Sequence, residues 1–203
     1  MDYWTLLQSD ADRWAAAGYT HARPGWRRAL SLMRYGGFRA TALYRAGHWA
    51  HRNRIPLIPS LTRELNHALH SIELTPHTPI GPGLYMPHTV GTVITAERIG
   101  ANCEFQGGIT IGQRTGNGFP TLGDGVVVSC GARILGKTVL GNGATVGANA
   151  VVIRNVPAGA LAVGVPARVI CKEGRSRHTT AAQSAIDQSS LESIRLLSRE
   201  VQP

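Results

Sequence analysis

The sequence has little of what marks several common classes of protein. Its three cysteines, Cys103, Cys130 and Cys171, are far apart and form no Cys-x-x-Cys pair, so we expect neither a disulfide framework nor a zinc or other metal site. No stretch approaches the roughly 20 consecutive apolar residues of a transmembrane helix. The first twenty residues contain three aspartates and lack the basic start and apolar core of a secretory signal, which favours a cytoplasmic location.

Acidic residues are also scarce. The chain has 12 Asp and Glu against 21 Lys and Arg, a formal net charge of +9, and much of the excess is arginine in the first seventy residues. Such a balance fits an anionic partner, such as nucleic acid, a membrane surface or a phosphorylated small molecule, or a helix face that arginines keep soluble. We expect no nucleic-acid partner, because the sequence offers neither an aromatic stacking platform nor a groove-reading helix.

Residues 1–71 are predicted to form a helical domain. Within residues 38–49, apolar residues recur at helical spacing and fall on one stripe, which consists of Phe38, Ala42, Leu43, Ala46 and Trp49. A proline-broken bend follows, and then a second amphipathic helix for which Ser60 is the expected N-cap.

A six-residue period replaces the helical spacing from Ile72 onward. Its clearest run of aliphatic residues is Leu122, Val128, Ile134, Leu140, Val146 and Val152. This period predicts a parallel β-helix over residues 72–172, in which three six-residue units form a triangular coil and coils stack about 4.8 Å apart. The aliphatic residue of each unit is expected to point into the core, and the small residue after it to permit a tight corner.

Two insertions interrupt this period. One residue is gained between Met86 and Ile99, and five are gained between Ile111 and Leu122 in "GQRTGNGFPT". Insertions in a solenoid leave the core as loops, often on the binding face. Residues 173–203 are polar with one weak helical pattern, and we expect a C-terminal tail that is partly helical or disordered.

Three segments carry a resemblance to a known family: "IELTPHTPIGPGLYMPHTVGTVI", "FQGGITIG" and "LAVGVPARVI". Together with the period they resemble the left-handed β-helix acyltransferases, most closely the serine O-acetyltransferase family, over roughly residues 35–172. Glu73 precedes His88 by fifteen residues, the interval between an aspartate and the catalytic histidine in that family. The resemblance implies a mainly β fold, a left-handed parallel β-helix with an N-terminal α-helical domain, and acyltransferase activity.

His88 is the strongest catalytic candidate. Moving an acetyl group from a thioester to an alcohol needs a base for the hydroxyl proton, and imidazole suits this role because its pKa is near neutral. A carboxylate on the other ring nitrogen would fix the tautomer, and Glu73 is expected on an adjacent coil near the same corner. The alternatives are that His88 packs at a coil corner, bonded to a carbonyl, and that Glu73 caps the preceding helix.

Other titratable residues have no motif support. We expect His67, His70 and His77 at the surface or at helix ends, and Cys103 and Cys130 as small core residues, because this chemistry needs no thiolate.

The resemblance also implies a co-substrate and further site residues. Acetyl-CoA, or another acyl-CoA, would lie along the coils, and a backbone amide near Gly112 and Gln113 would hold the oxyanion. Similarity to other hexapeptide acetyltransferases makes the donor-binding candidates Ala148, Arg154, Arg168 and Lys172. In the family the donor groove lies between subunits, which implies a homotrimer with shared active sites.

The acceptor site departs from the family pattern. Gly118, Phe119 and Pro120 replace an Arg-His-Pro triplet, and Pro87 replaces an aspartate before the catalytic histidine. Arg114 in the loop is a substitute partner for a carboxylate, so Pro87, Arg114 and Phe119 are the expected acceptor-binding residues.

We therefore expect an acceptor hydroxyl other than that of free serine. A sugar, as in the exopolysaccharide O-acetyltransferases that the chain also resembles, a secondary metabolite or a carrier-bound group would fit. The alternatives are a genuine serine O-acetyltransferase of cysteine biosynthesis and, in a different class, a non-catalytic hexapeptide scaffold.

Overall fold

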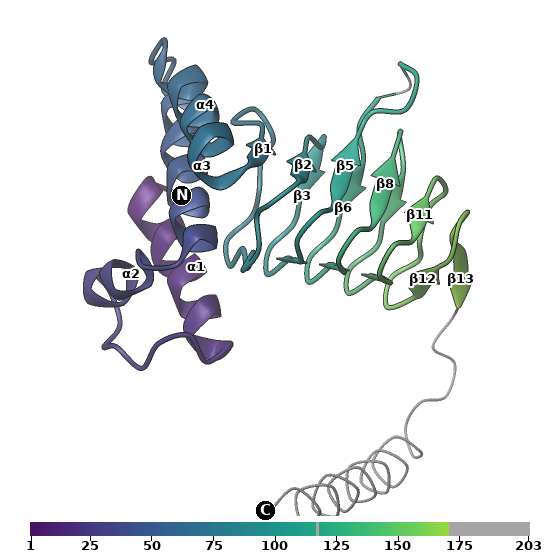
Figure 1. Cartoon of the computed structure of the whole chain (residues 1–203), viewed down its shortest axis with the longest axis horizontal. Helices are drawn as coiled ribbons and strands as arrows, with labels where there is room; N and C mark the ends of the chain where they lie inside the picture. The colour runs from purple at the N-terminus through teal and green to yellow at the C-terminus, as the bar shows by residue number, and fades with distance from the viewer. Residues whose placement is uncertain (117, 171–203) are drawn as a thin grey trace, which may run out of the picture. The chain divides into compact units, whose positions relative to one another are not determined.

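Four helices precede thirteen short strands in residues 1–116 and 118–170, the part of the chain that the computed structural model describes (Figure 1). The helices are α1 (Tyr3–Ala16), α2 (Trp26–Leu32), α3 (Gly36–Arg52) and α4 (Ile58–His70). The last helix thus ends directly before the segment in which the six-residue period begins. The predicted tail, residues 173–203, lies outside the described residues.

The start of α4 differs from the expectation. This helix begins at Ile58, with Leu57 as its N-cap and Pro59 in its first turn, so Ser60 lies inside the helix and its prediction as N-cap is wrong. Proline suits the first turn because its φ is already helical and its missing N–H would have no partner there. The proline therefore sets the start of the helix ahead of the serine.

The strands are two or three residues long and form three sheets. In chain order they are β1 (Ile72–Leu74), β2 (Thr92–Ile94), β3 (Arg98–Ile99), β4 (Glu104–Phe105), β5 (Thr110–Gly112), β6 (Thr121–Leu122), β7 (Val127–Val128), β8 (Arg133–Leu135), β9 (Val139–Leu140), β10 (Thr145–Val146), β11 (Val151–Val152), β12 (Leu161–Val163) and β13 (Arg168–Ile170).

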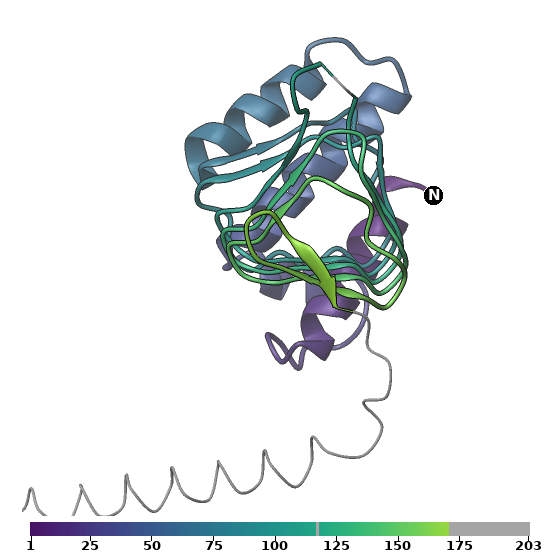
Figure 2. The ribbon, with the colours of Figure 1, turned by 90° about the vertical axis from the view of Figure 1, so that its right-hand side faces the viewer.

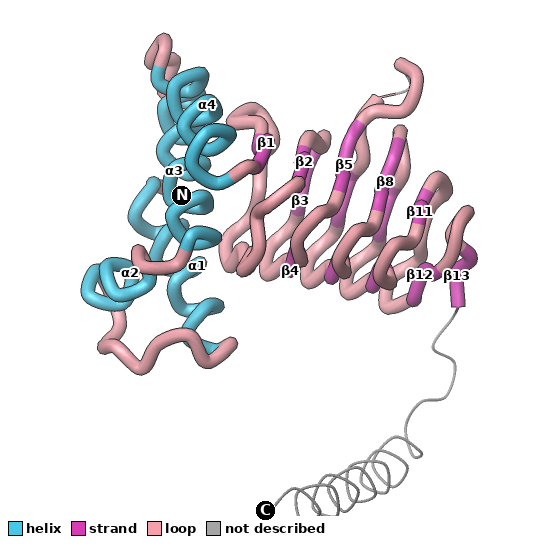
Figure 3. The backbone as a smooth tube through the Cα atoms, in the orientation of Figure 1, coloured by secondary structure: helices cyan, strands magenta, loops and turns pink. Residues whose placement is uncertain are grey.

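The sheets are the faces of a triangular prism, which Figure 2 shows end-on and Figure 3 from the side. We call β1-β2-β5-β8-β11 the first face, β3-β6-β9 the second face and β4-β7-β10-β12-β13 the third face. Paired strands are parallel, except that β12 and β13 close the described solenoid as an antiparallel pair. This is the left-handed parallel β-helix that the resemblance implies.

Two edges of this prism carry the predicted site. The histidine edge is where the chain turns from the third face to the first, at residues 87–91, 106–109, 129–132 and 147–150. The loop edge is where it turns from the first face to the second, at residues 95–97, 113–120, 136–138 and 153–155.

The six-residue period specifies the solenoid core. Every residue of the run from Leu122 to Val152 that was expected to point inward is at most 1% exposed, which confirms that prediction. The small residue after it serves mainly close packing: a Cβ on Gly123 would lie 2.8 Å from the backbone nitrogen of Asn142 in the next coil. The tight turn itself falls two residues later, where Gly125 has a φ of +65°, a conformation open mainly to glycine.

The five-residue insertion leaves the core as predicted. Leu122 pairs with Leu140, which is 18 residues further along, whereas Ile99 pairs with Leu122, which is 23 residues further along. The extra residues form the loop between β5 and β6, which stands clear of the prism on the loop edge (Figure 1). The coils above and below it keep their stacking.

A buried ion pair joins two helices to the first coil. Arg45 in α3 donates to the carboxylate of Asp10 in α1 at 2.8 and 2.9 Å, and to the carbonyl oxygens of Ile80 and Gly81 at 2.6 and 2.7 Å. Asp10 also accepts a hydrogen bond from the Leu84 N–H at 2.8 Å. Both charged side chains are fully buried. The backbone that leads to His88 is therefore held by groups from both helices.

The buried face of α3 matches the expected apolar stripe only in part. Trp49 is 44% exposed, whereas the polar side chains Tyr44 and His48 are buried. The Tyr44 hydroxyl donates to the Thr78 carbonyl at 2.6 Å, and Nδ1 of His48 lies 2.8 Å from the Pro76 carbonyl oxygen. Polar side chains can be buried here because the first coil offers carbonyl groups that need donors.

Candidate active site

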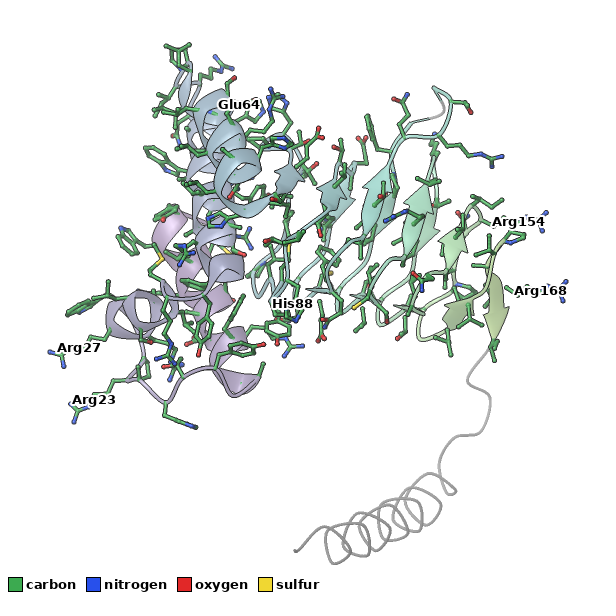
Figure 4. The ribbon with its side chains drawn as sticks, viewed as in Figure 1. Arg23, Arg27, Glu64, His88, Arg154 and Arg168 are labelled. Atoms are coloured by element: carbon green, nitrogen blue, oxygen red, sulfur yellow. The ribbon has the colours of Figure 1, made fainter. Side chains whose placement is uncertain are left out.

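His88 lies on the histidine edge, in the turn between the third face and β2. Its side chain is exposed, and Figure 4 shows it where the solenoid meets the helical part. Within the described residues no hydrogen bond or ion pair occupies the ring. This differs from the alternative of a histidine packed at a corner and bonded to a carbonyl, and it leaves the imidazole available to a substrate.

Close backbone packing fixes the segment that carries this ring. A Cβ on Gly37 of α3 would lie 2.1 Å from the carbonyl oxygen of Met86 and 2.9 Å from that of Pro87. On the other side, a Cβ on Gly107 of the next coil would lie 3.0 Å from Cβ of His88. The two glycines thus let a helix and a coil close on the histidine segment from either side.

Glu73 lies in the middle of β1 with its side chain exposed. It borders a pocket of about 270 Å³ together with Arg63, Glu64 and His67 of α4. No hydrogen bond or ion pair joins Glu73 to His88 in the part of the chain that the structure describes. The partnership of these two residues therefore stays a prediction.

The histidine edge continues past His88 as a ladder of backbone contacts. Gly108 donates to Val90, Gly131 to Gly107, and Asn149 to Cys130, with N to O distances of 3.1, 3.1 and 2.9 Å. Ala148, a predicted donor-binding residue, is exposed on this edge. The edge thus leads from His88 past two further turns to the turn that carries Ala148.

The two described cysteines differ from each other. Cys103 is buried, as expected, and burial raises the pKa of its thiol to about 11. Cys130 is exposed, so its prediction as a core residue is wrong. It lies two residues after the buried Val128, in the turn at residues 129–132, rather than at an inward position of the six-residue period.

The other predicted residues lie elsewhere. Gly112 ends β5, and Gln113 and Arg114 begin the protruding loop, where both are exposed; Phe119 is half-buried near its end. Arg154 is an exposed residue of the same loop edge, and Figure 4 shows it with Arg168 of β13 at the C-terminal end of the described solenoid. Lys172 lies outside the described residues.

Most of the predicted site residues that the structure describes divide between two edges of the first face, whereas Glu73 lies within that face and Arg168 lies in β13 of the third face. Pro87 and Ala148 share the histidine edge with His88, whereas the predicted oxyanion and loop residues lie on the loop edge. The strands of the first face separate the two groups within one chain. A site containing both groups needs the histidine edge of one copy to meet the loop edge of another.

Sequence reasoning missed charged residues near both edges. Glu97 and Lys137 border a groove of about 810 Å³ beside the loop; the available signal was their position at corners flanking the insertion. On the third face, Arg13 of α1 pairs with Glu104 at 3.1 Å, and Gln106 donates to Glu104 at 2.7 Å. Arg13 and Glu104 are too distant in sequence for any local pattern to reveal their contact.

Two further observations concern the described residues alone. They include no group of three or more His, Cys, Asp or Glu side chains placed to hold a metal ion. None of the helices described is long and apolar enough to cross a membrane.

Several known proteins are similar to this chain, although no family model matches it. A serine acetyltransferase of Synechococcus elongatus is 37% identical over 147 residues, which are 70% of this chain and 60% of that protein. One of Helicobacter pylori is 37% identical over 146 residues, 70% of this chain and 85% of that protein. The crystal structure of Neisseria gonorrhoeae serine acetyltransferase in complex with serine superposes with a TM-score of 0.72 and 25% identity, covering 83% of this chain and 69% of that one.

The extent of these matches differs between the relatives. The chain spans only 60% of the Synechococcus protein, but it spans most of the Helicobacter protein at the same identity, and it has the same solenoid with preceding helices as the Neisseria enzyme. The similarity thus includes sequence as well as fold. The chain belongs to the serine acetyltransferase family of hexapeptide-repeat acyltransferases.

Proposed function

We propose that this chain is an acetyl-CoA-dependent serine O-acetyltransferase with His88 as its general base. The observation that carries the proposal is the exposed, unengaged imidazole on the edge of a solenoid whose relatives are named serine acetyltransferases. Those names favour the alternative left open by the sequence, a genuine serine acetyltransferase, over the expected acceptor other than free serine.

The proposed reaction is a direct transfer. A neutral ring nitrogen of His88 accepts the hydroxyl proton of serine while the hydroxyl oxygen attacks the thioester carbonyl carbon. The new C–O bond places negative charge on the carbonyl oxygen, which the amides near Gly112 and Gln113 of a neighbouring copy would stabilise. The C–S bond then breaks, and the leaving thiolate of CoA takes the proton from the imidazolium. Glu73 remains the candidate that would orient the ring.

The histidine edge suits the donor. Ala148 lies three strand spacings from His88, about 14 Å along the prism, and the turns between them expose backbone groups and small side chains. A pantetheine arm placed along this edge would bring its thioester to the imidazole. Arg154 and Arg168, exposed near the C-terminal end of the described solenoid, and Lys172 are the candidate partners for the phosphates of CoA.

A different acceptor is the second candidate. It rests on the loop sequence Gly118, Phe119 and Pro120, which lacks the charged triplet of the family, and on Pro87 directly before His88. A sugar hydroxyl or a carrier-bound hydroxyl would need fewer charged contacts than the zwitterion serine.

Replacement of the proposed base tests the reaction. We expect His88→Ala to lower kcat/KM for acetylation of L-serine by roughly 100-fold or more, measured as release of CoA thiol and as acetylated product by mass spectrometry. His77→Ala is the matched control, because His77 is an exposed histidine of the same coil and should retain activity. A non-catalytic scaffold would show no turnover in either form, and turnover of nucleotide sugars or carrier-bound hydroxyls in place of serine would establish the second candidate.

A further inference from the structure

A groove of about 810 Å³ lies on the loop edge, between the protruding loop and the turn of the next coil. Phe119 of the loop and Val139 of β9 give it apolar walls. Thr138, which also borders it, is 4% exposed and keeps a hydroxyl oxygen without a hydrogen-bond partner. The groove thus combines apolar surface with an unused polar atom.

The groove also carries one charge of each sign. The carboxylate of Glu97 and the ammonium of Lys137 both border it, and both residues are exposed. No ion pair joins them, and none engages either of them with another described residue. A cation and an anion that face one cavity without neutralising each other match a ligand with both charges.

We propose that this groove binds the acceptor amino acid, with Lys137 contacting its α-carboxylate and Glu97 contacting its α-ammonium. This inference rests on the proposed serine acetyltransferase activity. It supplies, from residues outside the loop, a cation in place of the missing triplet and an anion in place of the aspartate that Pro87 replaces. Phe119 then lies against the carbon skeleton of the acceptor.

The groove serves a histidine from another copy of the chain. Within one chain, His88 and Glu97 stand at opposite ends of β2, on different edges of the prism, nine positions apart in the sequence. The six steps from Gly91 to Glu97 along the first face span roughly 20 Å at the rise of an extended strand. An acceptor in the groove therefore reaches the imidazole only when the histidine edge of a second copy faces this loop edge.

Paired substitutions of residue and substrate test the two contacts. We expect Lys137→Met and Glu97→Gln each to raise KM for L-serine by about 10-fold or more, with KM for acetyl-CoA unchanged. Serinamide lacks the carboxylate, so its KM should be the same with Lys137→Met as with the wild type. 3-Hydroxypropionate lacks the ammonium, so its KM should be the same with Glu97→Gln as with the wild type. Arg98→Met is the control, because Arg98 is an exposed cation next to Glu97 in the sequence that does not border the groove.

Binding without turnover separates this inference from the proposed function. Calorimetric titration of the His88→Ala variant with L-serine should show binding that Lys137→Met removes. If the wild-type chain acetylates serine while both groove variants keep its KM, the groove assignment is overturned and the proposed function stands. If the wild-type chain acetylates no acceptor, the proposed function itself fails.

Mixed oligomers test whether His88 and the groove of one site come from different copies of the chain. Coexpression of His88→Ala with Lys137→Met should yield sites that have both native residues, about a quarter of all sites for random mixing. Activity at low serine concentration should then exceed the average of the two parent variants. Activity equal to that average would show that base and groove belong to the same chain, which contradicts the shared site.

Discussion

The histidines of this chain differ in exposure, because they lie in different surroundings. His88 is exposed at a corner of the first coil, whereas His48 and His70 are buried, with exposed fractions of 9% and 7%. Burial lowers the pKa of both buried histidines from the usual value of 6.5. The exposed residue is suited to exchanging protons during a reaction, and the buried ones link folding to pH.

The stability of the fold should fall in mild acid. Because His48 and His70 stay neutral in the folded chain, the unfolded chain binds more protons once the pH falls below about 6.5. We expect the free energy of unfolding, measured with urea, to be lower at pH 5.5 than at pH 7.5. His48→Asn should reduce this difference, since an asparagine amide can still donate to the Pro76 carbonyl but does not titrate.

The exposed residue His67 supplies the control for that experiment. His67→Asn should leave the pH dependence as in the wild type. A pH dependence that His48→Asn leaves unchanged would contradict the assignment to the buried histidine.

Two adjacent glycines of α3 should differ sharply in their tolerance of a side chain. A Cβ on Gly37 would overlap the Met86 carbonyl, whereas a Cβ on Gly36 would meet its nearest atoms only at 3.8 Å. We expect Gly37→Ala to destabilise the fold by about 2 kcal/mol or more and to lower activity by displacing His88. Gly36→Ala should be neutral or slightly stabilising, as measured by urea denaturation and the thiol-release assay. Equal effects of the two substitutions would argue against the close approach.

A buried ion pair and backbone groups of the first coil join the helices to the solenoid through mutual hydrogen bonds. The carboxylate of Asp10 and the guanidinium of Arg45 satisfy each other and also three backbone groups of the first coil. Burial acts to raise the pKa of the Asp10 carboxyl, and Arg45 and the Leu84 N–H oppose this effect. Removing one partner therefore leaves an uncompensated charge inside the fold, which is far costlier than losing an exposed pair.

A double-mutant cycle should reveal this coupling. We expect Asp10→Asn and Arg45→Met each to lower the free energy of unfolding by about 3–5 kcal/mol, and the double variant to lose less than the sum of both. Arg63→Met, at the exposed pair of Arg63 and Glu64, should change it by less than about 1 kcal/mol. Additive effects at Asp10 and Arg45 would contradict a coupled pair.

The solenoid as a whole was predictable because the six-residue period of the sequence marks the residues that form its core. An inward position recurs every six residues, so the aliphatic run from Leu122 to Val152 identified both the fold and its buried residues. The five-residue loop was predictable for the same reason. The buried face of α3 was not, because Tyr44 and His48 are buried through hydrogen bonds to a coil that lies far along the chain.

The candidate site was predictable only at residues that a sequence motif marked. His88 stands at a corner because its place in the six-residue register puts it there. The groove around Glu97 and Lys137 was not predictable, because it forms only when the turns of three consecutive coils, the middle one carrying the inserted loop, come together. The predictions for Ser60 and Cys130 were wrong for local reasons. A proline starts the helix before Ser60, and Cys130 lies exposed in a turn of the coil.

Because the turns stack regularly along the histidine edge, the number of coils sets the length of this edge. Each added coil lengthens the track from His88 toward the C-terminal end by one strand spacing of about 4.8 Å, and it leaves the coils beneath unchanged. Excising one 18-residue repeat above the loop would therefore shorten the track in a single discrete step. In the proposed donor-binding mode, the number of repeats would set the length of donor that fits along this edge. Adding or removing a repeat would change that length by one coil at a time and leave the corner that carries His88 unchanged.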